Sequence, residues 1–375
     1  MQHTAVFMID GFDIRYFDRR NMPVMADMAG KGFFRQGSAI FPSLTNANNI
    51  SIACGAWPET HGVTTNCYYD PELGTARFLE SPDFLLSPTV FEMKTGKGKS
   101  VLLTCKSKTA KILGHMADIA VAAEEPEEFI CRKYGTPPPM YSAEINYWLT
   151  ETAVSMVKEY PVIDLIYIHT TDYPMHMWAP EEDESKEHMN RLDSLLGEFH
   201  KAAPHFGIAL TADHGMNAKK TCIDLAKACR ARGLELLFAV SPVADRLLKH
   251  HGGFGGVSYV YLKKPEDAQR AAEIFMSLAG VERVMTGAEA AARFSLMPSR
   301  VGDLVVLPDR DTVFGDLKTE RVSLPENYRS HGSLHELDIP LLLYNFKDRD
   351  FRFQDINFNL DLTRQLFINN GDKNA

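Results

Sequence analysis

Short, continuous apolar runs alternate along this chain with longer segments whose apolar residues repeat at helical spacing. Runs of the first kind predict strands that are buried on both faces, and each run ends in polar residues. The predicted strands cover residues 5–10, 100–106, 164–172, 206–215 and 339–345. Amphipathic helices are predicted over residues 144–157 and 188–199. This alternation is typical of an α/β fold, with a mainly parallel sheet sandwiched by helices.

Residues 218–325 show a different pattern from the rest of the chain. A strand at 256–262, a helix at 265–280 and a strand at 281–287 form a small unit, and the pattern of the large sheet resumes only at residue 339. We therefore expect a smaller α+β cap, residues 218–325, inserted into a catalytic domain formed by residues 1–217 and 326–375. Residues 122–142 are rich in Pro and Glu, which predicts a loop beside the functional site.

Composition restricts the function without defining it. Hydrophobic residues make up 45% and charged residues 24% of the 375-residue chain, which is ordinary for a soluble globular protein. A net charge of −9 argues against nucleic-acid binding. A small anionic substrate stays compatible with that charge, because a bound metal or a local lysine pair can reverse the field inside one cleft.

The cysteines and the first residues bear on the compartment. Six cysteines at irregular spacing without a CxxC pair favour reduced thiols, and an apolar strand begins close to Met1 where a signal peptide would otherwise lie. No apolar run is long enough to span a bilayer. We expect a cytoplasmic protein that has no membrane partner.

Aspartate and histidine residues gather at the ends of the predicted strands, where α/β sheets collect their functional groups. In chain order these candidate metal ligands are Asp10, Asp172, His176, Asp213, His214 and His331, with His335 as an alternative to His331. Mixed carboxylate and imidazole donors suit zinc or another borderline divalent ion better than Mg²⁺ or Ca²⁺. The set is too large for one tetrahedral ion, whereas two ions roughly 4 Å apart would use it fully in a displacement at phosphorus.

Thr45 lies in the stretch FPSLTNANNIS, at a predicted helix start. Backbone N–H groups and the helix dipole favour an anion at such a position. Without other evidence, Thr45 would be interpreted as a helix cap or a loop hydroxyl. A hydroxyl that is coordinated to a divalent cation has a much lower pKa, and it can then act as a nucleophile without a histidine base. Thr45 is therefore a candidate for both metal ligand and nucleophile.

Four segments of the chain, residues 41–66, 169–176, 211–217 and 329–342, resemble the alkaline phosphatase superfamily. Within it they resemble the branch that contains the nucleotide pyrophosphatase/phosphodiesterases and the phosphonoacetate hydrolases. The resemblance implies an alkaline-phosphatase-like fold and two Zn²⁺ ions, with Mn²⁺ or Fe²⁺ as substitutes. The implied ligands are Asp172, His176 and His331 for one ion, and Asp10, Thr45, Asp213 and His214 for the other. Asn66 is implied to donate to a phosphoryl oxygen.

Residues 102–114 resemble the segment of phosphonoacetate hydrolases in which two lysines, one residue apart, bind the substrate carboxylate. Those lysines would be Lys106 and Lys108, although a lysine pair after a strand is more often part of a solvated loop. The resemblance implies hydrolysis of the C–P bond of phosphonoacetate, or of a related carboxylated phosphonate, through a phosphothreonine at Thr45. Acetate and phosphate would be the products, and a homodimer is compatible with the resemblance.

The alternative enzyme uses the same two metals on an ester, as a phosphodiesterase, nucleotide pyrophosphatase or phosphomonoesterase. The sequence NANN at 46–49 lacks the PNH of many nucleotide-cleaving relatives, which argues against a nucleotide substrate. A binding protein that retained the fold without catalysis is a further alternative, and the complete ligand set argues against it.

Overall fold

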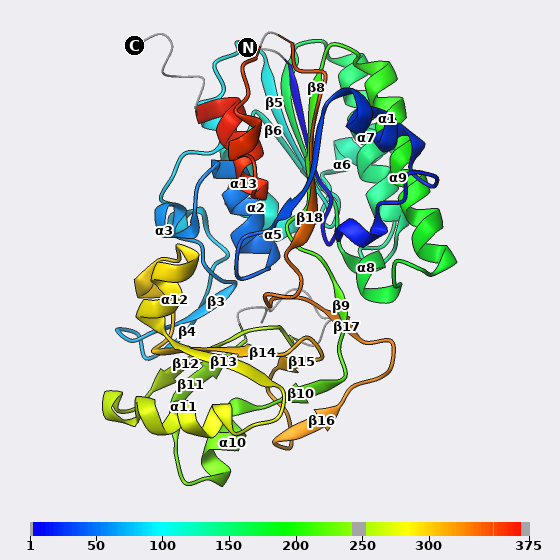
Figure 1. Cartoon of the computed structure of the whole chain (residues 1–375). Helices are drawn as coiled ribbons and strands as arrows, with labels where there is room; N and C mark the ends of the chain where they lie inside the picture. The colour runs from blue at the N-terminus through cyan, green and yellow to red at the C-terminus, as the bar shows by residue number, and fades with distance from the viewer. Residues whose placement is uncertain (1–2, 242–252, 348, 369–375) are drawn as a thin grey trace.

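The computed structural model describes residues 3–241, 253–347 and 349–368. The larger part of the protein is built on a seven-stranded sheet with the order β2-β18-β8-β1-β7-β5-β6 (Figure 1). Its strands are β1 (Thr4–Met8), β2 (Phe33–Ser38), β5 (Lys99–Thr104), β6 (Ile119–Ala122), β7 (Ile163–His169), β8 (Gly207–Thr211) and β18 (Asp338–Tyr344). The five strands from β8 to β6 are parallel, and β18 runs antiparallel to both of its neighbours. The predicted mainly parallel α/β sheet is confirmed.

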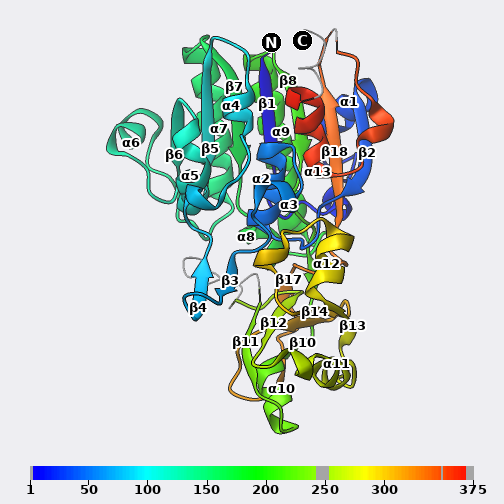
Figure 2. The same ribbon diagram turned by 90° about the vertical axis from the view of Figure 1, so that its left-hand side faces the viewer.

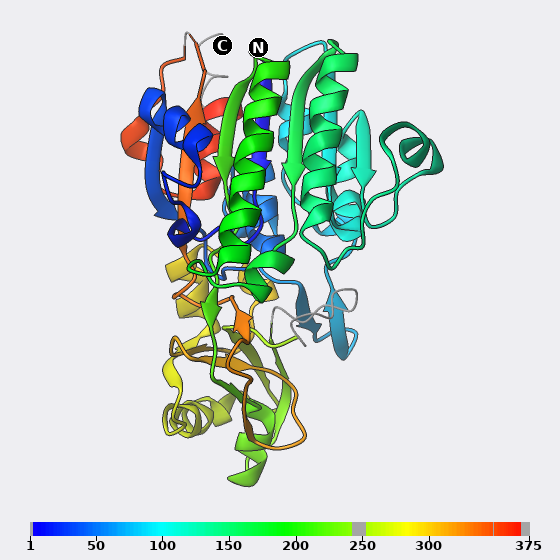
Figure 3. The ribbon, with the colours of Figure 1, turned by 90° about the vertical axis from the view of Figure 1, so that its right-hand side faces the viewer.

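Helices cover both faces of this sheet. On one face lie α7 (Glu144–Glu159) and α9 (Asp183–Ala202), which extend both predicted helices (Figure 3). On the other face lie α2 (Thr45–Cys54), α5 (Ser107–Leu113) and α13 (Asn359–Thr363) (Figure 2). The apolar side of α9 is buried through Met189, Leu192 and Phe199, which explains why its apolar residues recur at helical spacing. In the described residues, no helix is both long and apolar enough to cross a membrane.

A smaller part of the protein is built on two further sheets, which lie below the large sheet in Figure 1. One sheet has the order β11-β12-β14-β13, from β11 (Leu236–Val240), β12 (Ser258–Leu262), β13 (Val281–Thr286) and β14 (Leu304–Pro308). The other has the order β15-β10-β16, from β10 (Thr221–Ile223), β15 (Thr312–Phe314) and β16 (Arg321–Ser323). Three helices accompany them, α10 (Leu225–Ala231), α11 (Ala268–Met276) and α12 (Gly287–Phe294). All these elements lie within the expected cap, and the exact boundaries of the cap stay a prediction.

Three segments differ from the sequence expectation. The edge strands β2 and β6 were not expected. Much of β2 is half-buried and it carries no continuous apolar run, whereas β6 is apolar but only four residues long. Residues 122–142 were expected to form a loop, yet they contain the short helix α6 (Glu128–Tyr134). The side chain of Ile130 is buried and marks the inner side of α6. Glu128 at the start of α6 and Lys133 near its end have the charges that the helix dipole favours.

A buried ion pair joins the two parts of the protein. Both side chains, Lys219 and Glu336, are fully buried, and Lys219 Nζ lies 2.8 Å from Glu336 Oε1. Asn217 Nδ2 donates to the same oxygen, and Ser333 donates to Oε2 through its hydroxyl and its backbone N–H. Lys219 also donates to the carbonyl of Arg310. Glu336 therefore links the segment in which the chain leaves the large sheet for the smaller part to the segment in which it returns.

We predict a large difference between two adjacent lysines in this region. Lys219→Ala leaves the Glu336 charge buried without its partner, which should lower the free energy of unfolding by about 3–5 kcal/mol. Lys220→Ala removes an ion pair with Asp311 whose side chains are 74% and 46% exposed, so the loss should stay below about 1 kcal/mol. Urea denaturation of both variants measures the difference. Equal losses would contradict the structural role of the buried pair.

His188 gives a pH dependence that can also be tested. Burial between α7 and α9 lowers the pKa of His188 to about 3, so the unfolded chain binds a proton between pH 6 and 4 that the folded chain does not. Stability should therefore fall as the pH falls through this window, and His188→Gln should reduce that slope by about 1.4 kcal/mol per pH unit. Urea denaturation at several pH values measures the slope. The exposed His115→Gln serves as the control, and an unchanged slope in His188→Gln would contradict the prediction.

Candidate metal centre

The topology brings the expected ligands to one edge of the large sheet. Asp10 and Asp213 each follow the end of a parallel strand by two residues, and Asp172 follows the end of β7 by three. These three strands, β8, β1 and β7, are neighbours in the sheet. Because β18 is antiparallel, its beginning lies at the same edge as the ends of the parallel strands, and the segment before it brings His331 there.

One group that could hold a metal ion consists of Asp10, Asp213 and His214, whose ligand atoms lie within 4.8 Å of one another. His214 Nε2 lies 3.5 Å from Asp10 Oδ1 and 3.3 Å from Asp213 Oδ2. The other oxygen of Asp213, Oδ1, accepts hydrogen bonds from the backbone N–H groups of Gly11 and His214. Gly11 has a φ of +74°, and a Cβ at that position would lie 2.9 Å from the Cβ of Asp172, so glycine is required there.

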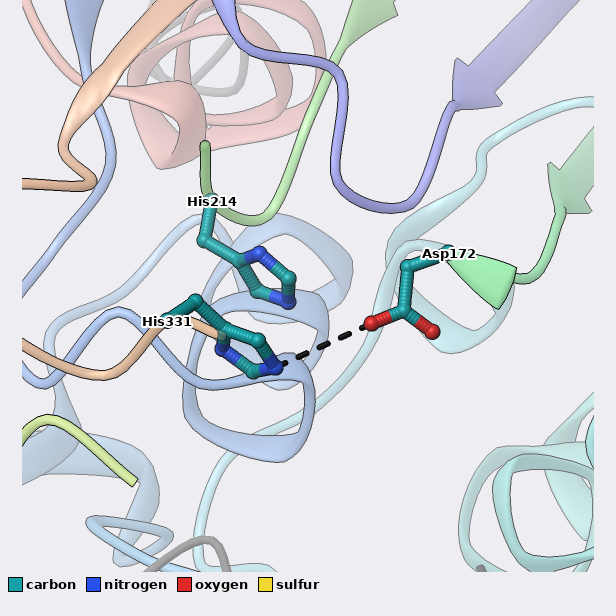
Figure 4. A group of neighbouring side chains, drawn as sticks. All are labelled: Asp172, His214 and His331. Carbon is teal, nitrogen blue, oxygen red and sulfur yellow. Dashed lines mark ion pairs between the residues drawn. The ribbon is translucent and has the colours of Figure 1, made fainter. Parts of the chain in front are cut away.

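The second group consists of Asp172, His214 and His331 (Figure 4). The rings of His214 and His331 are stacked, with 3.5 Å between their centroids, and His331 Nε2 lies 3.7 Å from Asp172 Oδ2. His176, from the short helix α8 (Tyr173–Met177), places its Nε2 2.9 Å from the same oxygen. The structure thus brings together all six residues that the sequence singled out as ligands. His335, the alternative, instead contacts Glu282 at 2.8 Å and is part-exposed.

Three histidines share a hydrogen-bond pattern that suits metal ligands. In each, Nδ1 lies within hydrogen-bond distance of a backbone carbonyl: Arg329 for His176, Gly215 for His214 and Ser43 for His331. A carbonyl can only accept, so each Nδ1 carries a hydrogen, and in the neutral form of the ring Nε2 presents its lone pair to the centre. Second contacts of this kind fix the tautomer and orientation of metal-binding histidines. The residues present therefore fit a divalent metal.

The electrostatics lead to the same conclusion. Burial and the neighbouring charge of Asp10 raise the pKa of Asp213 well above its usual range. Burial lowers the pKa of His214 and of His331, so both rings are neutral, which is the form that binds metals. Among the described residues, Asp10 Oδ1 and Asp213 Oδ2 are buried and accept no hydrogen bond. Two carboxylate oxygens that accept no hydrogen bond thus lie beside three imidazole nitrogens. These oxygen and nitrogen atoms are a set of ligands that suits a cation.

Thr45 is the first residue of α2, as expected, and its Oγ1 lies 3.4 Å from His214 Nε2. It is half-buried, whereas the six ligands around it are buried. The hydroxyl therefore lies beside the ligands and remains the most accessible group of the set. The role of Thr45 as nucleophile stays a prediction.

The expected substrate-binding residues are all buried. Lys106 follows the end of β5, and its Nζ lies 2.5 Å from Asp10 Oδ2 and 3.5 Å from Asp172 Oδ1. This ammonium group thus contacts a carboxylate of each metal-binding group. Lys108 in α5 is 6% exposed, and Asn66 precedes the strand β3 (Cys67–Asp70) and is 8% exposed. Their contacts with substrate stay predictions.

The sequence interpretation missed His169, the last residue of β7. Its ring is fully buried, with Nε2 3.3 Å from Asp10 Oδ2. It lies within the segment 169–176 that carries two expected ligands, and its place opposite Met8 on β1 puts it beside the strand that leads to Asp10. This contact could be found only if the pairing of β1 with β7 were known, and the sequence alone does not reveal that pairing.

A model of the type I phosphodiesterase/nucleotide pyrophosphatase family matches residues 4–334. This chain belongs to that family. An ectonucleotide pyrophosphatase/phosphodiesterase of Caenorhabditis elegans is 28% identical over 229 residues, which are 56% of this chain and 26% of the relative. An uncharacterized pyrophosphatase/phosphodiesterase of Schizosaccharomyces pombe is 26% identical over 281 residues, 69% of this chain and 53% of the relative. The chain thus spans about a quarter to a half of the length of these curated relatives.

Solved structures match over almost the whole chain. Phosphonoacetate hydrolase from Sinorhizobium meliloti, in complexes with phosphonoformate and with phosphonoacetate, is 27% identical, with a TM-score of 0.84. The match covers 96% of this chain and 94% of that one. Murine ectonucleotide pyrophosphatase/phosphodiesterase 5 shares the fold at 16% identity, with a TM-score of 0.69 and coverage of 98% and 95%. The alkaline-phosphatase-like fold inferred from the sequence is confirmed in this family member.

Two histidines four residues apart provide a test of the metal centre. His331→Ala removes an Nε2 lone pair from the cluster and should lower the zinc bound by the purified protein by one equivalent. His335→Ala removes only the surface contact with Glu282 and should leave the zinc content unchanged. Elemental analysis after dialysis measures both variants.

Removal of metal with a chelator should also lower the thermal midpoint of the wild type, since an ion that binds only the folded state stabilises it. A midpoint that a chelator leaves unchanged would contradict the metal centre.

Proposed function

We propose that this protein is a two-metal hydrolase that cleaves the C–P bond of phosphonoacetate or of a closely related carboxylated phosphonate. Thr45 attacks phosphorus in line with that bond, whose electrons leave with the carbon atom, and the carbon atom takes a proton to give acetate. Water then hydrolyses the phosphothreonine, which yields phosphate and restores Thr45. The zinc ions, when bound, supply Lewis-acid stabilisation of the charge on the phosphoryl oxygens.

The residues divide this work by their chemistry. Asp10, Asp213 and His214 with Thr45 are proposed to hold one ion, and Asp172, His176 and His331 the other. Asn66 donates its amide N–H to a phosphoryl oxygen. Lys106 and Lys108 hold the carboxylate and stabilise negative charge as it develops on the leaving carbon.

The observation that carries the proposal is the position of Lys106. Its buried ammonium group lies 2.5 Å from Asp10 Oδ2 and 3.5 Å from Asp172 Oδ1. When divalent cations compensate those carboxylates, the positive charge of Lys106 would attract a second anionic group of the substrate. Phosphonoacetate carries such a group, and a simple phosphate ester does not. The likeness to phosphonoacetate hydrolase at 27% identity over 96% of this chain adds support.

Hydrolysis of a phosphodiester or of a nucleotide pyrophosphate is the second candidate. The family description and the curated relatives favour it, since both bear those names. The same two metals and Thr45 would serve the reaction, with an alkoxide in place of a carbanion as the leaving group. The cytoplasmic location and the homodimer expected from the sequence stay predictions.

A comparison of two substrates separates these candidates. Zinc-loaded protein should release phosphate from phosphonoacetate at a kcat/KM at least about tenfold higher than that for a nitrophenyl phosphodiester, a difference of about 1.4 kcal/mol in barrier. Lys108→Ala should lower activity on phosphonoacetate alone. Lys111→Ala, on the same helix α5 but with its side chain 57% exposed, should change neither activity. Equal losses on both substrates in Lys108→Ala would contradict the carboxylate role, and a preference for the diester would favour the second candidate.

Thr45→Ala tests the nucleophile. Removal of the hydroxyl should lower kcat by about 10³-fold or more, equivalent to about 4 kcal/mol of barrier, because no other nucleophile is proposed. Phosphate-release assays measure the rate, and mass spectrometry of the quenched wild-type reaction should detect the phosphothreonine. Turnover of Thr45→Ala near the wild-type rate would contradict this mechanism.

A further inference from the structure

A chain of buried polar side chains links the helix that carries Thr45 to the metal ligand Asp10. It runs from Tyr167 through Asn49 and His169 to Asp10, and all four side chains are buried. The Tyr167 hydroxyl donates to Asn49 Oδ1 at 2.6 Å, and Asn49 Nδ2 lies 3.3 Å from His169 Nδ1. His169 Nε2 lies 3.3 Å from Asp10 Oδ2. Polar groups are costly to bury, so a connected series of this kind needs a structural or functional reason.

The partners of His169 determine which ring nitrogen carries its proton. The Nδ1 side decides, because His169 Nδ1 faces an amide N–H group, whereas Nδ1 of His176, His214 and His331 each faces a carbonyl. The amide of Asn49 is oriented by Tyr167, which leaves its N–H group to donate to His169 Nδ1. The hydroxyl of Thr104 lies 2.9 Å from the same Nδ1 and 3.4 Å from the carbonyl of Lys106, and its single hydrogen can be donated to either. The Asn49 amide thus leaves the hydrogen of the neutral ring on Nε2, from which it is donated to Asp10 Oδ2.

This tautomer is the opposite of that in the three metal-binding histidines. His176, His214 and His331 carry the proton on Nδ1 and present an Nε2 lone pair to the centre. His169 presents an N–H group at the same edge of the sheet, so it cannot ligate a metal there through Nε2. It can only donate to Asp10.

We propose that His169 is a positioning residue for Asp10. Together with the Lys106 ammonium group, 2.5 Å from Asp10 Oδ2, its Nε2–H group holds that oxygen, so that Oδ1 is directed to the metal beside His214. Asn49 and Tyr167 are the residues that keep His169 in this tautomer. Asn49 lies one helical turn after Thr45 on α2, so the same chain of hydrogen bonds fixes the helix of Thr45 relative to Asp10. The proposal rests on the metal-dependent part of the proposed function and is independent of which substrate is cleaved.

The effect should appear in zinc affinity, measured by competition with a chromogenic chelator on metal-free protein that is then titrated with zinc. His169→Phe keeps the bulk of the ring without its N–H group, and should weaken the affinity for one of the two zinc equivalents by about 10–100-fold. His169→Gln can place an amide N–H group near the position of Nε2 and should recover most of that affinity. His188→Phe, which replaces another buried histidine between α7 and α9, should leave both zinc affinities unchanged.

Tyr167→Phe tests the chain by the loss of one hydroxyl. It should weaken the same zinc affinity by a smaller factor, and it should have no further effect in the His169→Phe background, because the two residues act through one path. Wild-type zinc affinity in a folded His169→Phe protein would overturn the proposal. Equal losses in His169→Phe and His169→Gln would also overturn it, because packing and not the N–H group would then be responsible.

If His169→Phe does not fold, Tyr167→Phe alone decides the question: weakened zinc affinity supports the proposal and unchanged affinity overturns it. Failure of the proposed function has a different signature. If the wild-type protein binds no zinc, the metal centre does not exist and the role proposed for His169 is overturned with it. A wild-type protein that binds two zinc ions but does not cleave phosphonoacetate would leave the role of His169 intact.

Discussion

Three buried carboxylates, those of Asp10, Asp172 and Asp213, lie at one edge of the sheet, and the rest of the site depends on how their charge is balanced. Removal of a carboxylate from water is costly unless positive charge or hydrogen bonds compensate. Lys106 supplies one positive charge, at 2.5 Å from Asp10. Burial lowers the pKa of His214 and of His331, so these two rings are neutral and supply lone pairs. Divalent cations are then the natural source of the remaining charge. The same balance would let a protein with a net charge of −9 receive the anionic substrate that we propose.

The geometry of the strands brings these groups together. Three neighbouring parallel strands end at the same edge, and the antiparallel β18 begins there, so segments distant in sequence converge. The segment with His331 is joined to the segment before Thr45, since His331 Nδ1 donates to the carbonyl of Ser43 and the Ser43 hydroxyl donates to the carbonyl of Ser333. Glu336 and Lys219 anchor the far side of that segment. The segment with His331 is thereby hydrogen-bonded both to the residues that precede Thr45 and to Glu336.

The parts that could be predicted from the sequence are those with a local signal. Central strands were predicted because their sequences are continuous apolar runs. The candidate ligands were predicted because they lie at short spacing after such strands or, for His331, before the last one. The edge strand β2 lacks a continuous apolar run, and α6 lies in a segment rich in Pro and Glu, so neither had that signal. The role of His169 depends on partners from three other segments, Asp10, Asn49 and Thr104, and none of these contacts is visible before the chain is folded. The direct contact of Lys106 with Asp10 and Asp172 was missed for the same reason.

The most direct measurement of the central claim is anomalous X-ray scattering at the zinc edge from crystals of the zinc-loaded protein. Two zinc ions roughly 4 Å apart are expected. One should be bound by Asp10, Thr45, Asp213 and His214, and the other by Asp172, His176 and His331. A single ion at this edge of the sheet, or ions bound by other residues, would contradict the two-metal centre on which the proposed hydrolysis depends.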